Sequence, residues 1–116
     1  QNIPSSKDKE PVKVHTITHS ERFIEHEGFQ VIADDDGQIL TDMELLAYLR
    51  NVRSKIMKTE NKPVYTIIGN KGLVSLATYR PENREEFIAL YGLGETTYDA
   101  YGLQFIQAIK DFEKDS

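Results

Sequence analysis

The chain has 116 residues, no cysteine and a net charge of −5 at pH 7. This length predicts a single domain that buries about two thirds of its extended-chain surface, and the lack of cysteine excludes disulfides, thiolate metal sites and cysteine nucleophiles. No apolar run reaches the roughly 18–20 residues of a membrane span and no signal peptide opens the chain, so we expect no membrane partner and a cytoplasmic location. The first residue is Gln1 rather than Met, and we therefore expect a piece of a longer protein.

The charges are unevenly distributed along the chain. Residues 1–40 carry four basic and eight acidic groups, whereas residues 41–116 carry ten basic and eleven acidic groups. A net acidic chain argues against strong non-specific DNA affinity, because that affinity comes mainly from neutralised phosphates. Only a local basic face could bind nucleic acid.

The first forty residues fall into two segments. Residues 1–11 are polar, contain two prolines and have no periodicity, which predicts a disordered lead. Residues 12–40 alternate in part, at 12–18, and place Asp34-Asp35-Asp36-Gly37 between two apolar runs, a pattern that favours a hairpin turn. We interpret residues 12–40 as a linker or a small β element.

A helix is predicted from about residue 42 to residue 58. Thr41 and Glu44 have the spacing of a capping box, and Leu40 and Leu45 that of a hydrophobic staple. Apolar residues then recur at helical spacing, namely Leu45, Leu49, Val52 and Ile56. Asn61 and Pro63 are expected to end this helix, and residues 63–68 to form an extended connector.

Two more helix starts follow the connector. Asn70 is expected to cap a helix that buries Leu73, Leu76 and Ala77 and ends at Pro81. Asn83, with Glu86 three residues on, is expected to begin a helix whose apolar stripe is Phe87, Leu90 and Tyr91.

Gly92 is placed just past the end of that helix, where glycine is common. A short helix over about 95–100 and a last one over about 103–112, after Gly102, complete the chain; the last should bury Phe105, Ile106, Ile109 and Phe112. The predicted fold is mainly α: a compact bundle of about five short helices over residues 41–116, with a small extended or β-hairpin segment before it.

A series of short motifs resembles a known family. The motifs, in chain order, are Leu49-Arg50-x-Val52-Arg53, Pro63-Val64-Tyr65, Leu73…Ala77…Arg80-Pro81, Gly92-Leu93-Gly94-Glu95, Tyr101-Gly102 and Phe105…Ile109. Over residues 46–109 the chain resembles the HRDC (helicase and RNase D C-terminal) domain, most closely the form at the C-terminus of RecQ-type DNA helicases. The turn departs from the family at Glu95-Thr96-Thr97, where Lys or Arg is frequent.

The resemblance implies an accessory nucleic-acid-binding domain that binds single-stranded or branched DNA weakly, at the C-terminus of a RecQ-like ATP-dependent helicase acting in DNA replication, recombination and repair. ATP and Mg²⁺ would belong to that motor, and no cofactor is expected in this segment. The helicase core is a further candidate partner. Two alternatives stay open: a protein-interaction domain without DNA binding, favoured by the acidic charge, and the HRDC domain of an RNase D-like nuclease.

The candidate DNA-binding residues are Arg50, Arg53, Lys58, Lys62 and Tyr65. Arg50 and Arg53 share part of a polar helix face, and Lys62 and Tyr65 lie just past the helix end. Cations can follow a phosphate backbone while an aromatic ring stacks on an unpaired base. A solvated helix flank, with Tyr65 in the core, is the simpler interpretation of the same residues.

Gly92 and Gly94 form a candidate phosphate-contacting turn, because a turn before a helix directs backbone N–H groups outward. The dinucleotide-binding fingerprint does not fit, since no strand precedes these glycines and Thr97 stands in the third glycine position. The same glycines could simply supply the dihedral angles of a chain reversal. We favour the structural interpretation of this turn.

Catalytic and metal sites are not predicted. Aligning Gly37 with the sixth position of a calcium loop would put Ile32 and Met43 where carboxylates are required. His15, His19 and His26 have helical spacing, but their segment is not convincingly helical. No P-loop or nucleophile elbow is present, so no catalytic residue is assigned.

Overall fold

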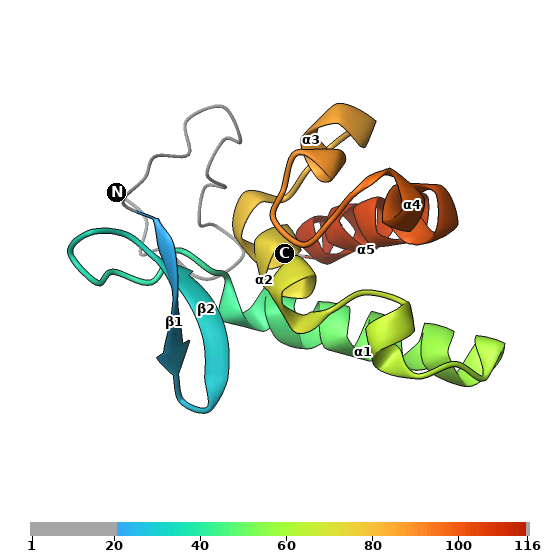
Figure 1. Ribbon diagram of the computed structural model, residues 1–116, viewed down its shortest axis with the longest axis horizontal. Coiled ribbons are helices and arrows are strands. Elements are labelled where there is room, and N and C mark those ends of the chain that lie inside the picture. Colours follow the sequence, from blue (N-terminus) through green and yellow to red (C-terminus); the bar gives the residue numbers. More distant parts are fainter. Residues whose placement is uncertain (1–20, 116) are drawn as a thin grey trace.

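The computed structural model describes residues 21–115, which form an N-terminal hairpin beside a mainly helical body (Figure 1). The elements are β1 (Arg22–His26), β2 (Phe29–Ala33), α1 (Met43–Glu60), the 3₁₀ turn η3 (Val64–Thr66), α2 (Asn70–Tyr79), α3 (Arg84–Ile88), α4 (Glu95–Thr97), the π-helical turn η4 (Tyr98–Gly102) and α5 (Leu103–Lys114). The predicted mainly α fold with an N-terminal hairpin is confirmed. The lead predicted over 1–11 and the alternation at 12–18 lie outside the described residues.

The hairpin turns at Glu27-Gly28. Strands β1 and β2 are antiparallel, with a register that runs from Arg22 opposite Ala33 to His26 opposite Phe29. Both loop residues have positive φ, 52° at Glu27 and 86° at Gly28. A two-residue loop with two positive φ angles matches the twist of the strands that it joins, and this favours a tight hairpin.

The predicted turn at Asp34–Gly37 exists, but it does not join the two strands of the sheet. The Asp34 carboxylate accepts hydrogen bonds from the backbone N–H groups of Asp36 and Gln38 at 3.0 and 2.9 Å. Across this turn the predicted flanking runs pair in antiparallel fashion at Ala33 and Ile39, and the Leu40 N–H donates to the Ile32 carbonyl at 2.8 Å. The turn that joins β1 to β2, at Glu27-Gly28, was not predicted, because it lacks the Asx signal of the later turn.

Helix α1 is capped one residue later than predicted. The Asp42 side chain accepts a hydrogen bond from the Leu45 N–H at 3.1 Å, so Asp42 and not Thr41 is the N-cap. The helix then runs to Glu60 and ends at Asn61, which has a left-handed φ of 55°. Both residue types can cap a helix, and Thr41 is used elsewhere.

A relay of hydrogen bonds through Thr41 fastens the hairpin to the helices. The Ile32 N–H donates to the Thr41 hydroxyl at 2.8 Å, and that hydroxyl lies 2.7 Å from the Thr78 hydroxyl. Since Thr78 donates its own proton to the Val74 carbonyl, Thr41 is the donor to Thr78. Strand β2 thereby joins the start of α1 to α2, and Ile32 belongs to the hydrophobic core.

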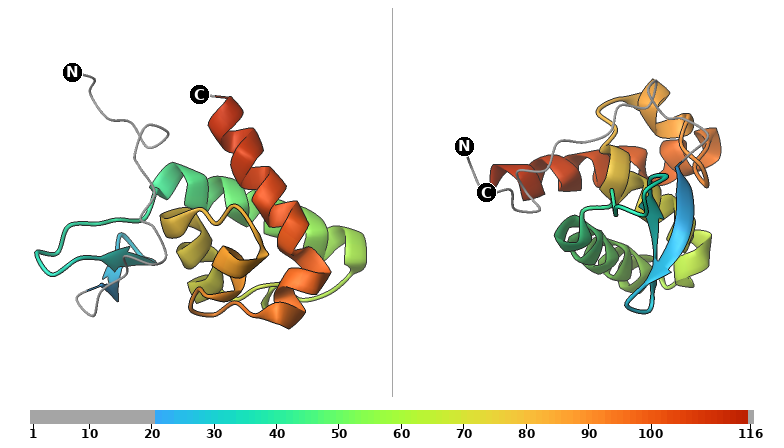
Figure 2. Two further views of the ribbon diagram at one scale, coloured as in Figure 1. Left: turned by 90° about the horizontal axis from the view of Figure 1, so that it is seen from above. Right: turned by 90° about the vertical axis from the view of Figure 1, so that its left-hand side faces the viewer.

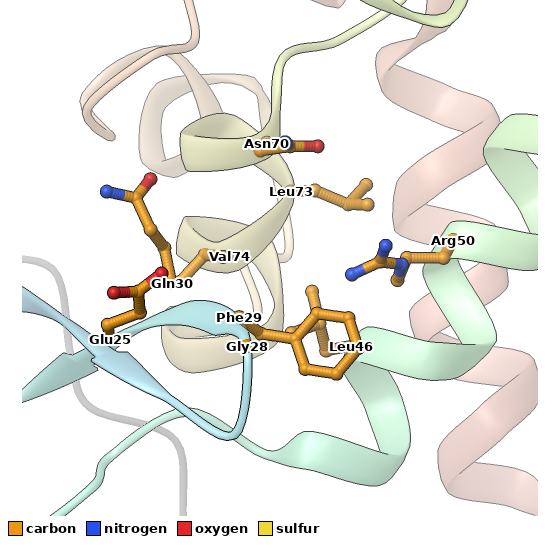
Figure 3. Close-up of a pocket in the computed structure, with 9 residues that line it drawn as sticks. All are labelled: Glu25, Gly28, Phe29, Gln30, Leu46, Arg50, Asn70, Leu73 and Val74. Atoms are coloured by element: carbon orange, nitrogen blue, oxygen red, sulfur yellow. The ribbon is translucent and has the colours of Figure 1, made fainter.

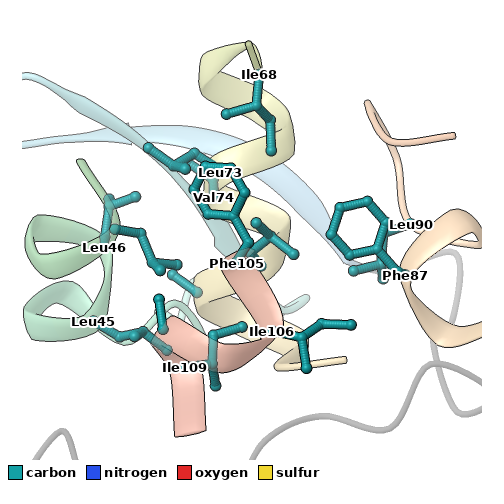
Figure 4. Close-up of a cluster of buried hydrophobic side chains, with 14 of the residues drawn as sticks. Leu45, Leu46, Ile68, Leu73, Val74, Phe87, Leu90, Phe105, Ile106 and Ile109 are labelled. Carbon is teal, nitrogen blue, oxygen red and sulfur yellow. The ribbon is translucent and has the colours of Figure 1, made fainter. Parts of the chain in front are cut away.

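Helix α2 is the central element, and every residue from Gly72 to Tyr79 is buried. The predicted inward residues Leu73, Leu76 and Ala77 are 0–1% exposed. Figure 4 shows side chains of α1, α2, α3 and α5 meeting in this core. Asn70 does not cap the helix as predicted: Gly69 is the N-cap and makes no side-chain hydrogen bond, because the Asn70 amide has another partner, described below.

The C-terminal half departs from prediction in two places. Asn83 caps α3 as expected, accepting from the Glu86 N–H at 2.9 Å, but α3 ends at Ile88 and leaves Tyr91 64% exposed rather than in an apolar stripe. Gly102 does not separate two helices, because its φ of −55° and ψ of −46° are helical. Glycine is required here for another reason, because the Tyr98 ring occupies the space that a Cβ of residue 102 would fill.

Three helix ends meet at Arg80, the residue that follows α2. Its guanidinium pairs with the Asp42 carboxylate at 2.8 Å and with the Glu113 carboxylate at 3.1 Å. The side chains of Arg80 and Asp42 are only 5% and 1% exposed. Helix α5 packs across α1 (Figure 2), and the Arg80 ion pairs join it to the start of α1 and the end of α2.

Candidate nucleic-acid interface

Basic residues concentrate in one continuous part of the chain. Residues 45–81 contain seven basic groups and a single acidic one, a net charge of +6, whereas the rest of the chain carries −11. This basic stretch comprises most of α1, the turn η3 and all of α2. A negatively charged chain therefore has one region in which phosphate would be favoured.

The five predicted DNA-binding residues lie in this stretch, but Arg53 is buried, with 7% of its surface exposed. Its guanidinium donates to the Ile68 carbonyl at 3.1 Å and to the Asn70 side-chain oxygen at 3.0 Å. Burial, and to a smaller extent the neighbouring Arg50 charge, lowers the pKa of Arg53 from its ordinary value. Arg53 therefore positions the start of α2, and we do not carry it forward as a phosphate contact.

Arg50 lies at a cleft between the hairpin and the helices. The cleft has a volume of about 360 Å³ and is lined by residues of β1, β2, α1 and α2. Figure 3 shows Arg50 reaching toward it from α1, with Phe29 of the hairpin beside the guanidinium. The Arg50 guanidinium carbon lies 4.5 Å from the centre of the Phe29 ring, a cation–π contact.

Lys58, Lys62 and Tyr65 surround the C-terminal end of α1. Lys58 and Lys62 line a shallow groove of about 570 Å³ together with Met57, Asn61 and Pro63. Tyr65, in η3, is 76% exposed, and its ring is therefore not a core element. Eight residues of helix separate Arg50 from Lys58, a rise of about 12 Å along α1.

The acidic residue of the basic stretch, Glu60, is already engaged. Its carboxylate accepts a hydrogen bond from the Tyr101 hydroxyl at 2.7 Å and lies 3.6 Å from the Lys62 ammonium. The hydrogen bond to Glu60 raises the pKa of Tyr101 from its ordinary value, with burial as the second cause. The negative charge of the Glu60 carboxylate offsets part of the positive charge at this end of α1, where the Lys62 side chain is 55% exposed.

The Gly92–Gly94 turn is built for close packing. Gly92 has a φ of +81°, and a Cβ there would lie 3.0 Å from the backbone nitrogen of Gly72. Gly94 is extended, with a φ of −163°, and has open space around it. Beyond the turn, Glu95 lies 3.4 Å from Arg84, so the first charge after it is acidic and paired.

Lys71 and Tyr91 were not among the predicted site residues, and both lie exposed near each other on the surface. Lys71, in the first turn of α2, places its ammonium 5.4 Å from the centre of the Tyr91 ring. Tyr91 follows α3 and had been assigned to a buried stripe. The uninterrupted positive charge from residue 61 to residue 81 was the available signal for Lys71.

Between Glu21 and Asp115, no group of three or more histidine or acidic side chains could hold a metal ion. Over the same residues no helix is long and apolar enough to cross a bilayer.

Comparisons with known proteins place this geometry in context. A model of the HRDC domain family matches residues 42–109. The chain is 33% identical over 73 residues to the ATP-dependent DNA helicase RecQ of Pasteurella multocida (strain Pm70), which covers 63% of this chain and 12% of that protein. It is 29% identical over 69 residues to the ATP-dependent DNA helicase UvrD2 of Mycobacterium tuberculosis (strain ATCC 25618 / H37Rv), covering 60% and 10%.

A solved structure agrees with the sequence matches. The D. radiodurans RecQ HRDC domain 3 superimposes with a TM-score of 0.56 and 31% identity, covering 59% of this chain and 90% of that one. The chain spans about one tenth of the length of the curated helicases that it matches. The β-hairpin precedes the residues that match the family model.

Proposed function

The chain belongs to the HRDC domain family, and from this membership we propose that it is an accessory domain of a RecQ-like ATP-dependent DNA helicase that binds single-stranded DNA weakly. The relatives with which it shares the domain are DNA helicases. In this proposal the motor lies elsewhere in a longer cytoplasmic protein, together with its ATP and Mg²⁺. The domain itself supplies DNA contacts and not chemistry.

The observation that carries the proposal is an exposed tyrosine beside two lysines. Tyr65 is 76% exposed, and Lys58 and Lys62 line a groove that also includes Pro63, two residues before Tyr65 in the chain. A tyrosine that is not needed by the core offers a flat face to an unpaired base, while the ammonium groups contact the phosphates on either side. Arg50, about two helical turns before Lys58 on the side of the hairpin, adds a third cation near the same strand path.

The same arrangement predicts weak and sequence-independent binding. Ammonium and guanidinium groups at the surface contact phosphates, which are identical along the strand and carry no sequence information. A net charge of −5 gives little long-range attraction, so local contacts must hold the strand. We expect single-stranded and branched DNA to bind better than a continuous duplex, because only unpaired bases can stack on Tyr65.

A second candidate function is protein interaction without DNA. The residues outside the basic stretch carry a net charge of −11, and Glu82, Glu85 and Glu86 lie exposed or half-buried around α3. An acidic surface of this kind suits docking onto a basic partner, for which the helicase core is one candidate. This alternative predicts no affinity for oligonucleotides at any salt concentration.

The test is an anisotropy titration of a labelled oligothymidine at several salt concentrations. If Arg50, Lys58 and Lys62 neutralise about three phosphates, log affinity falls against log salt with a slope of about −2. Tyr65→Ala should cost about 1–3 kcal/mol of binding free energy, whereas Tyr65→Phe, which keeps the ring, should cost much less. Unfolding curves of both variants control for stability. Absence of binding at low salt and high protein concentration would favour the protein-interaction function.

A further inference from the structure

A second exposed aromatic ring lies outside the predicted DNA site. Tyr91 is 64% exposed, and its ring centre lies 5.4 Å from that of Phe23 in an edge-to-face arrangement. Phe23 belongs to strand β1, which precedes the residues that match the HRDC family. The hairpin therefore places a ring from outside the matched residues against Tyr91, which lies within them.

The two rings border a groove of about 550 Å³ between β1, α2 and the turn after α3. This volume is within the range of small-ligand sites, and the groove is open to solvent along one side. Ile32 and Ala89 contribute apolar surface to it. An apolar groove edged by rings accepts a flat, uncharged group such as a nucleobase.

Tyr91 is held in place through its backbone. The Ser75 hydroxyl contacts the Tyr91 carbonyl at 3.1 Å, which ties the residue to α2. The next residue, Gly92, has a φ of +81° and packs directly against the backbone of Gly72. The turn that the sequence offered as a phosphate contact therefore fixes the position of an aromatic ring.

The charge at this groove favours phosphate. The Lys71 ammonium lies 5.1 Å from the centre of the Phe23 ring and 5.4 Å from that of Tyr91, so one cation serves both rings. Glu21, whose carboxylate accepts a hydrogen bond from the Tyr79 hydroxyl at 2.9 Å, also lines the groove, but Arg22 lines it too, so Lys71 leaves the lining with a net positive charge. A ring pair with an adjacent ammonium group has the elements of a base-stacking site.

We propose that Tyr91, Phe23 and Lys71 form a second stacking platform, which takes an unpaired nucleobase of the same single strand that contacts Tyr65. The inference rests on the proposed function and extends it. Tyr65 and Lys71 are six residues apart, which limits their Cα separation to about 22 Å. Because the Lys71 ammonium lies beside the Tyr91 ring, a strand of several nucleotides that leaves Tyr65 can pass Lys71 in the first turn of α2 and reach Tyr91.

Single-tryptophan reporters test this platform, because the chain contains no tryptophan. Three variants are compared: Y91W for the second platform, Y65W for the first, and D35W, in the exposed acidic turn, as the matched control. Each is titrated with an oligothymidine of about 15 nucleotides, a length within the range of single-strand sites. A stacked thymine quenches indole fluorescence, so we expect quenching in Y65W and Y91W but not in D35W.

Two further measurements separate stacking from general attraction. A duplex of the same length should quench neither reporter, because paired bases cannot stack on a side chain. In the otherwise native chain, Tyr91→Ala should weaken binding of the long oligonucleotide about fivefold or more, and Tyr91→Phe should restore it. Unfolding curves confirm that each variant is folded.

The outcomes distinguish this inference from the proposed function. Quenching in Y65W with none in Y91W would overturn the second platform and leave single-strand binding in place. Quenching in Y91W alone would support stacking on Tyr91 and overturn both the shared strand and the proposed role of Tyr65. If no reporter is quenched and anisotropy detects no complex, both proposals are wrong.

Discussion

The two ends of α1 use charged residues in opposite ways. At its N-terminal end Asp42 is 2% exposed and pairs with a buried arginine, Arg80, at 2.8 Å. At its C-terminal end Lys58 and Lys62 are exposed around a shallow groove. One helix thus begins in a buried ionic network and ends in cations that stay at the surface.

The chemistry of the side chains matches this division. Between Glu21 and Asp115 the two buried basic residues, Arg53 and Arg80, are arginines, whose planar guanidinium can bind several acceptors at once. The exposed pair at the end of α1 are lysines, which are compact, strongly hydrated charges. Basic charge in the sequence is therefore a poor guide to a DNA site until burial is known.

The largest effect is expected at the N-terminal end. Asp42→Ala removes the N-cap of α1 and leaves Arg80 buried without its closest partner, and breaking a buried pair in this way costs about 3–5 kcal/mol. Urea unfolding followed by circular dichroism measures the loss.

Two variants divide this effect between the cap and the charge. Asp42→Asn keeps a good capping residue and removes only the charge, so it should cost less than Asp42→Ala. Glu113 is a second partner of Arg80, and its side chain is 41% exposed. Glu113→Gln should therefore cost less than about 1 kcal/mol. Equal losses at Asp42 and Glu113 would contradict the division between buried and exposed charge.

In the middle of α1, the buried Arg53 and the less buried Arg50 show the same contrast between charges that the fold uses and charges near the surface. Arg53→Ala leaves the Ile68 carbonyl without its donor and frees the Asn70 amide, so we expect a loss of about 1–3 kcal/mol in unfolding free energy. Arg50→Ala removes a cation–π contact at the cleft edge and should cost about 1 kcal/mol or less. The ratio between the two losses is read from parallel thermal melts.

Much of the helical framework could be predicted because its signals are local. The start and end of α1 were placed within two residues, and Asn83 was identified as the cap of α3. The inward-facing residues of α2 and α5 followed from helical spacing. In each case the deciding interaction lies within four residues along the chain.

The wrong predictions concern residues whose hydrogen-bond partners are distant in the sequence. Thr41 and Asp42 are both good capping residues, but the Thr41 hydroxyl hydrogen-bonds to Thr78, 37 residues away, and does not cap the helix. Arg53 has the spacing of a polar face, but residues 68–70 fold back over it. Tyr65 was selected for its position after the helix, and the structure places it on the surface; its role in DNA binding stays a prediction.

The two glycines of the turn provide the next test. Gly92 combines a φ of +81° with backbone contact to Gly72, so Gly92→Val should destabilise by about 1–3 kcal/mol. Gly94 is extended and has open space around it, so Gly94→Val should cost less than about 1 kcal/mol, mainly through a poorer cap for α4.

The same turn offers a binding test. Glu95→Lys should raise DNA affinity only if phosphate approaches the turn directly, because the Glu95 carboxylate now lies beside Arg84. An unchanged affinity would leave the turn with the structural role that its packing indicates. Anisotropy titrations of the variant and the native chain at one salt concentration make the comparison.

The smallest change in stability, with a clear change in binding, is expected at the C-terminal end of α1. Lys58→Gln with Lys62→Gln removes two exposed charges, one of which lies 3.6 Å from Glu60, and surface pairs of this kind contribute little. Lys58 is in the last turn of α1, where a cation is favoured by the helix dipole, so a loss of up to about 1 kcal/mol is expected from the two changes. Binding should respond far more, because one cation of three remains: the slope of log affinity against log salt should flatten from about −2 to about −0.7. A double variant that unfolds early would mean that these lysines support the fold as Arg80 does. A double variant that keeps the native salt slope would place the phosphates elsewhere on the basic stretch.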